Sequence, residues 1–153
     1  MIIDSSLQIA AGISVVSGTG TTLIGSQIDT WGDVGFDIPR LSLVIVANSP
    51  IITGGSAGTL QFALASDTSA AISTTTSQVL MYTPQFVTGS TPIPAGAILF
   101  VCRLPLSVGV LPVARRFIGL LQITGTAAVT GGGINSFLTE DAGRWAANAQ
   151  AAN

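Results

Sequence analysis

The chain has no lysine and no histidine, a single cysteine, and few charged residues of either sign. Charged side chains make up 8% of its 153 residues, against about a quarter in ordinary soluble domains, whereas 48% are hydrophobic. Without histidine or lysine, most pairs of nucleophile and base are excluded. The net charge of -2 also argues against a nucleic-acid partner, because affinity for phosphates comes mainly from basic side chains.

Long hydrophobic runs are missing as well. The best candidate, residues 95–114, contains Arg103, Pro105 and Pro112, so no transmembrane helix and no membrane partner are expected. Asp4 stands where a secretory signal would carry basic residues, so we expect the product to stay where it is made. The lone Cys102 cannot form an internal disulfide, and its apolar neighbours predict a small buried filler in a reducing compartment.

What the sequence does contain is a series of short alternating or fully apolar runs, separated by clusters of Gly, Pro, Ser and Thr. This pattern predicts an all-β chain. The expected strands cover residues 8–16, 21–28, 40–47, 59–66, 78–82, 97–104, 116–124 and 127–138. About eight strands with long connections favour a jelly-roll-like two-sheet β-sandwich over residues 1–139, followed by a short C-terminal arm over residues 140–153.

Several strands have two apolar faces. In "TLQFALAS" the residues Leu60, Phe62 and Leu64 alternate with milder ones and predict one core face. The runs 40–47 and 97–104 are apolar on both sides. We therefore expect one face of each to pack on the second sheet and the other on another subunit.

The stretch "ARRFIGLLQITG" also has two largely apolar rows, and it begins with two adjacent arginines. Arg116 leads the row that contains Ile118 and Leu120, and Arg115 leads the opposite row that begins with Phe117. Arginines at a strand entry favour pairing with backbone carbonyls or carboxylates, here at a subunit border. An anion site and a plainly solvated charge remain open alternatives.

No motif points to a cofactor, a metal or a catalytic group. Asp29, Asp33 and Asp37 form the one acidic cluster, and their spacing by four favours turn-forming roles over a calcium loop or a glycosidase pair. The run Gly131–Gly133 lacks the lysine and the strand-to-helix setting of a phosphate-binding loop, so it predicts a turn or bulge.

The tail changes character after Glu140 and Asp141 and becomes rich in alanine. It predicts a short helix or an extended arm, with a frayed end as the alternative. Because a large aromatic side chain is costly to leave on a free end, we expect Trp145 to fill a pocket on a neighbouring subunit, with Arg144 at its rim.

Five segments follow one another along the chain: "MIIDSSLQI", "DVGFDIPRLSLVIV", "GTLQFALASD", "IPAGAILFVCRLP" and "RRFIGLLQITGTAAVTGGGINSFLTED". In this order they resemble a family of capsid cement (decoration) proteins of short-tailed bacteriophages. The resemblance runs from Met1 to Asp141, although each motif alone is weak. The family often has an aromatic residue and then Arg after the first Arg, where this chain has Arg116, Phe117 and Ile118, and the tail beyond Asp141 is extra.

The resemblance implies a jelly-roll-like, non-enzymatic virion protein on the capsid exterior, present in the host cytoplasm during assembly. Its implied partners are the major capsid protein and itself, as a dimer or trimer, with no cofactor. The interface candidates are Arg115, Arg116, Ile118, Leu120, Arg144 and Trp145. Alternatives are another virion β-protein, such as a head fibre base or tail component, and a carbohydrate-binding jelly-roll module.

Overall fold

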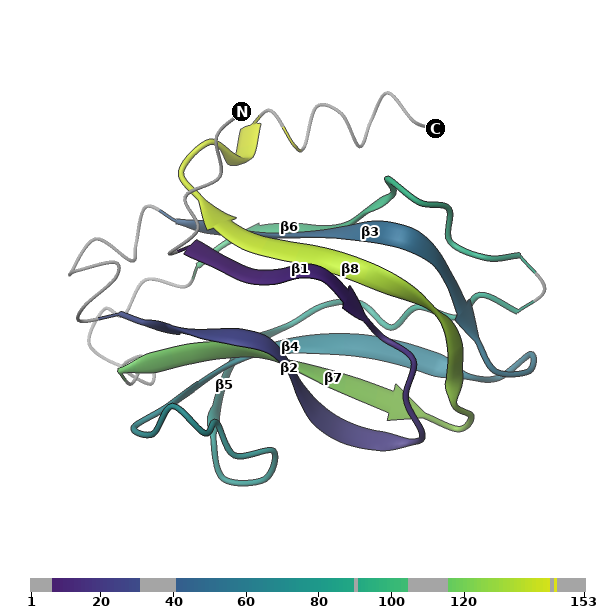
Figure 1. Ribbon diagram of the computed structural model, residues 1–153, viewed down its shortest axis with the longest axis horizontal. Helices are drawn as coiled ribbons and strands as arrows, with labels where there is room; N and C mark the ends of the chain where they lie inside the picture. The colour runs from purple at the N-terminus through teal and green to yellow at the C-terminus, as the bar shows by residue number, and fades with distance from the viewer. Residues whose placement is uncertain (1–6, 31–40, 90, 105–115, 144, 146–153) are drawn as a thin grey trace.

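Eight β-strands are arranged in two sheets (Figure 1). The computed structural model describes residues 7–30, 41–89, 91–104, 116–143 and 145. The strands are β1 (Gln8–Ser14), β2 (Gly20–Asp29), β3 (Ser42–Thr53), β4 (Thr59–Asp67), β5 (Gln78–Tyr82), β6 (Ile98–Arg103), β7 (Phe117–Gly125) and β8 (Val129–Thr139). The predicted all-β architecture is confirmed.

The strand order is that of a jelly roll. One sheet, here called sheet A, has the order β1-β8-β3-β6, and sheet B has the order β2-β7-β4-β5. All the neighbouring strands pair antiparallel. The first strand therefore pairs with the last, the second with the seventh, the third with the sixth and the fourth with the fifth, which is how a long hairpin wraps into two packed sheets.

The strands begin and end within a few residues of the predicted positions, with one exception. The run expected to stop at residue 47 continues as β3 to Thr53. Its pairing with β8 shifts register between Ala47 and Ser49 and again between Ser49 and Ile52. Pro50 cannot donate to a ladder, and the strand accommodates it through these bulges, so a predicted break is a bent continuation.

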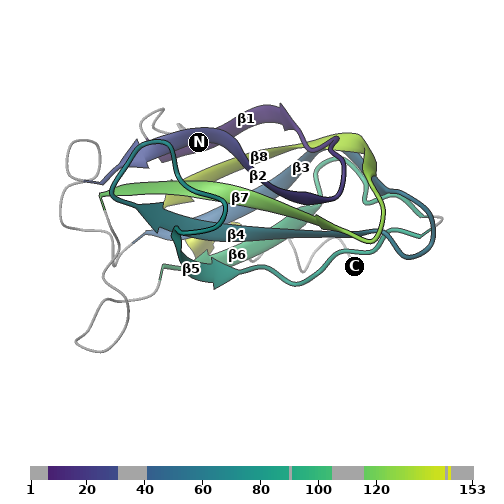
Figure 2. The ribbon, with the colours of Figure 1, turned by 90° about the horizontal axis from the view of Figure 1, so that it is seen from below.

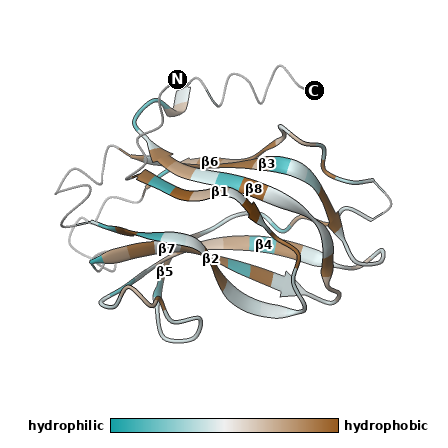
Figure 3. Ribbon diagram, viewed as in Figure 1, coloured by the Kyte–Doolittle hydropathy of each residue, from teal (hydrophilic) through white to brown (hydrophobic). Residues whose placement is uncertain are grey.

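The core lies between the two sheets. Leu60, Phe62 and Leu64 of β4 point into it, as their alternation predicts, and all three are buried. From sheet A they meet Leu43 and Ile45 of β3. Hydrophobic residues occupy stretches of strands in both sheets (Figure 3), and the larger buried cluster contains residues of both.

The sandwich has two different ends. Strands β2, β4, β6 and β8 finish at one end, where Asp67 and Asp29 both pair with Phe117 and Ser42 pairs with Arg103. The opposite end is formed by four connections, which cover residues 15–19, 54–58, 83–97 and 126–128. The two ends differ in chemistry, as described below.

Neutral hydrogen bonds hold the second end together. Thr53 and Thr88 each donate a backbone N–H to the hydroxyl of the other, over 2.9 and 3.1 Å, and both are buried. The buried amide of Gln122 donates from Nε2 to the carbonyl of Val15 at 2.8 Å and to the hydroxyl of Ser17 at 2.7 Å. Two of the four connections are thus fastened to the strands without any charged group.

Candidate interaction surfaces

Arg116 binds a carboxylate of its own chain. Its Nε donates to both oxygens of Asp29 at 3.0 Å, and Nη2 donates to Oδ2 at 2.6 Å. The guanidinium also lies 4.9 Å from the ring centre of Phe117, and the Arg116 carbonyl accepts from the Thr30 backbone and hydroxyl. Arg116 therefore joins the start of β7 to the end of β2, and the carboxylate pairing expected at a subunit border occurs within one chain.

This ion pair is electrostatically favourable but open to water. The hydrogen bond to Asp29, and then the charge of its carboxylate, raise the pKa of Arg116 above its ordinary value. The side chains of Arg116 and Asp29 are 47% and 22% exposed, so solvent screens the pair. Asp29 thus has a pairing role rather than a turn-forming one, while Asp33, Asp37 and Arg115 lie outside the described residues.

The row that follows Arg116 faces the core. Ile118 and Leu120 are completely buried in the cluster between the sheets. This corrects the expectation that they contact a neighbouring subunit. Because β7 lies inside sheet B, between β2 and β4, its inward row is covered by sheet A of the same chain.

The opposite row of β7 is covered in part by the connection 68–77, which crosses the outer face of sheet B (Figure 2). Ile72 in this connection is buried and packs with Leu121, Ala63 and Ala65 in a second, smaller cluster. A Cβ added at Gly119 would lie 2.6 Å from Ile72 Cδ1, so the glycine makes room for this side chain. The chain itself therefore covers much of the apolar surface that was expected to meet another subunit.

A buried carboxylate shapes that connection. Asp67, at the end of β4, accepts from the Thr68 backbone through Oδ1 at 2.7 Å and from the Ser73 backbone through Oδ2 at 3.1 Å. The side chain of Thr68 also reaches Oδ1 at 3.4 Å. A carboxylate that accepts backbone N–H groups closes a local turn, so Asp67 holds the connection in the position that places Ile72 on Gly119.

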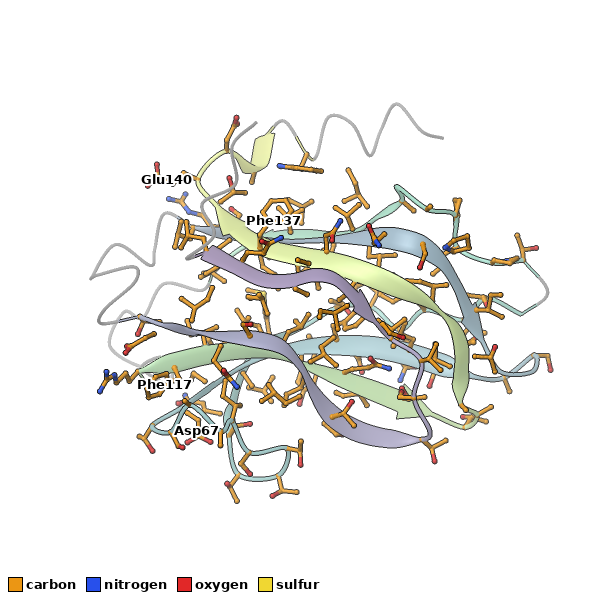
Figure 4. The ribbon with its side chains drawn as sticks, viewed as in Figure 1. Asp67, Phe117, Phe137 and Glu140 are labelled. Atoms are coloured by element: carbon orange, nitrogen blue, oxygen red, sulfur yellow. The ribbon has the colours of Figure 1, made fainter. Side chains whose placement is uncertain are left out.

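Trp145 docks on its own chain. Its ring lies 5.1 Å from that of Phe137 in an edge-on arrangement, and Phe137 points away from the core on the outer face of sheet A (Figure 4). The indole Nε1 is buried and has no acceptor among the described residues. Trp145 thus has an aromatic partner within its own chain, and its expected contact with a neighbouring subunit stays a prediction; Arg144 lies outside the described residues.

Two further predictions were tested by the structure. Gly132 lies within β8 at a φ of +123°, beside the register shifts of the β3 pairing, so the predicted bulge at Gly131–Gly133 is confirmed. Cys102 was expected to be a buried filler, but it is exposed on β6, at the edge of sheet A. Edge position explains the difference, because β6 has a neighbouring strand on one side only.

Within the described part of the chain, no three metal-ligating side chains come together, and no helix is long and apolar enough to cross a lipid bilayer. Comparison with known proteins adds no identification, since neither a protein-family model nor a curated protein sequence matches the chain.

Proposed function

We propose that this chain is a capsid cement protein, a non-enzymatic structural component of a bacteriophage virion. In this role it binds the outer surface of the icosahedral head and clamps neighbouring major capsid subunits. The observation that supports the proposal is the nested jelly-roll strand order, found in a chain whose segments from Met1 to Asp141 resemble that family in their order.

The composition supports a protein that works in contact with other copies and with a shell. Charged residues make up only 8% of the chain, and low charge favours association over a dispersed monomer. A contact of about 800 Å² per partner is modest by itself. Repeated over a symmetric lattice, the same contact becomes strong because each bound site holds the next in place.

The arrangement of aromatic side chains argues against the carbohydrate-binding alternative. Sugar sites of this kind need aromatic rings on one surface. Tyr82 pairs with Ala63 on the outer face of sheet B, whereas Trp145 packs on Phe137 outside sheet A. These two rings therefore lie on opposite faces of the sandwich, and Trp31 lies outside the described residues.

The proposal is tested on empty, tailless capsids. A cement protein is expected to remain in stoichiometric amounts with the shell protein, and capsids that carry it should resist heating better than capsids stripped of it. If the protein co-purifies with tails or fibres instead, the other virion role is correct. Specific retention on an oligosaccharide resin, with no capsid binding, would favour the carbohydrate module.

A further inference from the structure

All the charge of the described residues lies at one end of the sandwich. These residues are Asp29, Asp67, Arg103, Arg116, Glu140 and Asp141. Asp67, Phe117 and Glu140 mark this end in Figure 4. The remaining charged residues lie outside the described residues; in the sequence they occur before β1, between β2 and β3, between β6 and β7, or after β8.

Within the described part of the chain, the opposite end carries no charged residue. Its four connections read "VVSGT", "GGSAG", "TPQFVTGSTPIPAGA" and "TAA". A protein end that meets only water ordinarily carries charges of both signs, because these keep molecules apart. The complete lack of charge in four separate connections therefore indicates a surface that meets protein.

Four of the five large hydrophobic side chains that are exposed among the described residues lie at or near the same end. Val16 (55% exposed) and Val87 (53%) lie in its connections, and Ile52 (39%) and Ile13 (36%) stand one residue before the strand ends that enter them. The fifth, Tyr82, lies opposite Ala63 in the middle of β4, on the outer face of sheet B. Apolar side chains gathered in one region, with charge depleted around them, are the signature of an interface core.

This surface is also held in place before any partner arrives. The reciprocal bonds of Thr53 and Thr88 fasten the connection that carries Val87 to the end of β3. The amide of Gln122 fastens the connection that carries Val16. Association through such a surface loses less conformational entropy, since the two connections that carry Val16 and Val87 are already fastened.

We infer that the charge-free end is a self-association surface, at which it meets the same end of a second copy across a two-fold axis. A charge buried against an uncharged surface stays unpaired and opposes binding. Among the described surfaces of this chain, the charge-free one is this end, so the matching surface is the same end of another copy. A two-fold contact then pairs each patch with itself, as isologous dimers do.

A head-to-tail arrangement fails the same criterion. It would place Asp67, Arg116 or Glu140 of one copy against the uncharged connections of the next. The four connections also supply about as many residues as one side of a stable interface uses, roughly 20 to 30. The end-to-end dimer does not depend on the proposed capsid function. If that function holds, the dimer presents its two charged ends outward, one to each of two shell subunits.

The test measures the oligomeric state of the purified full-length chain by sedimentation velocity at a series of micromolar concentrations. The wild-type chain is expected to be a dimer. The double variant Val16→Asp, Val87→Asp should dissociate at least about 30-fold more readily, because like charges then face each other in a desolvated contact. Both valines are more than half exposed, so the circular dichroism spectrum should not change.

A matched control places the same two charges at the other end. Ala70 and Thr74 are exposed in the connection between β4 and β5, and Ala70→Asp, Thr74→Asp should leave the dimer intact. Mixing the Val16→Asp, Val87→Asp chain with a Val16→Arg, Val87→Arg chain should restore a one-to-one dimer. This rescue separates a contact between these ends from a defect in folding.

Several results would overturn the inference. A wild-type monomer at these concentrations contradicts it, and if capsid binding is then lost in the Val16→Asp, Val87→Asp chain, the end belongs to the shell contact instead. If the wild-type chain is an oligomer and neither Val16→Asp, Val87→Asp nor Ala70→Asp, Thr74→Asp changes it, self-association occurs through another surface. If the wild-type chain is a dimer but does not bind capsids, that result counts against the proposed function and not against the dimer.

Discussion

At the scale of single residues, the ion pair between Arg116 and Asp29 joins two strand ends at the solvent surface. We expect Arg116→Ala to lower the thermal midpoint by no more than about 2–4 °C, and Arg116→Lys by less, because exposed pairs contribute little. A differential scanning measurement at low and high salt checks this, with Asp29→Asn as the companion that removes the same pair from its other side. A larger loss that salt does not reduce would show that Arg116 supports the fold through more than its charge.

The pH dependence of this pair follows from the direction of the pKa shift. The carboxylate of Asp29 raises the pKa of Arg116 in the folded chain. A raised value for a base means that the stabilisation is complete below the ordinary arginine pKa and is lost only as pH rises through the still higher folded value. Titration of Arg116 should therefore leave stability unchanged around neutral pH.

Ile72 is the residue that covers the outer face of β7. Replacing it with alanine should lower the free energy of unfolding by about 2 kcal/mol, the lower part of the range for a buried isoleucine, because its cluster is small. Urea unfolding measures the change. Gly119→Ala is the informative companion, since the flexible end of Ile72 can move away and the loss should be smaller. A negligible effect of Ile72→Ala would mean that the connection does not cover the sheet in solution.

At the scale of elements, the C-terminal arm begins with an aromatic contact inside one chain. Ending the chain at Gly143 should lower the thermal midpoint by an amount that does not depend on protein concentration, because Trp145 packs on Phe137 of the same chain. An anchor that crossed to a neighbour would give a loss that grows on dilution. Thermal scans over a range of concentrations distinguish the two, with Trp145→Ala as the matched single substitution.

At the scale of the whole molecule, the nested strand order governs how the chain folds. Gly12 donates its backbone N–H to the side chain of Asn135, and β1 pairs with β8 along the whole strand. Contacts between the two extremes of a chain must form against the entropy of closing a long loop. We expect refolding in milliseconds to seconds, measured by stopped-flow fluorescence. Refolding within microseconds would show that local contacts dominate the transition state.

A chain that stops before β8 is the second check at this scale. Because β8 lies between β1 and β3, a chain ending at Thr126 would leave β1 without a neighbour in sheet A. It should show no cooperative thermal transition, whereas the chain ending at Gly143 retains all eight strands and should unfold cooperatively. A cooperative transition in the shorter chain would contradict the dependence of sheet A on β8.

The sequence by itself determined where the strands lie and which residues of β4 face the core. Alternation places Leu60, Phe62 and Leu64 on one side whatever surrounds the strand, because successive side chains point to opposite faces. The Gly, Pro, Ser and Thr clusters likewise mark most strand ends correctly. The cluster around Pro50 was the exception, since a bulged strand contains the same residue types as a break.

Only the tertiary structure decided what covers the remaining apolar rows. Ile118 and Leu120 face sheet A, Ile72 covers Gly119, and Trp145 packs on Phe137, all within one chain. An apolar row in the sequence predicts that its side chains will be covered, but it does not predict whether a distant segment or another molecule covers them. Likewise, the charged residues are scattered along the sequence, and those that the structure describes gather at one end because antiparallel strands return to the same end at every second connection.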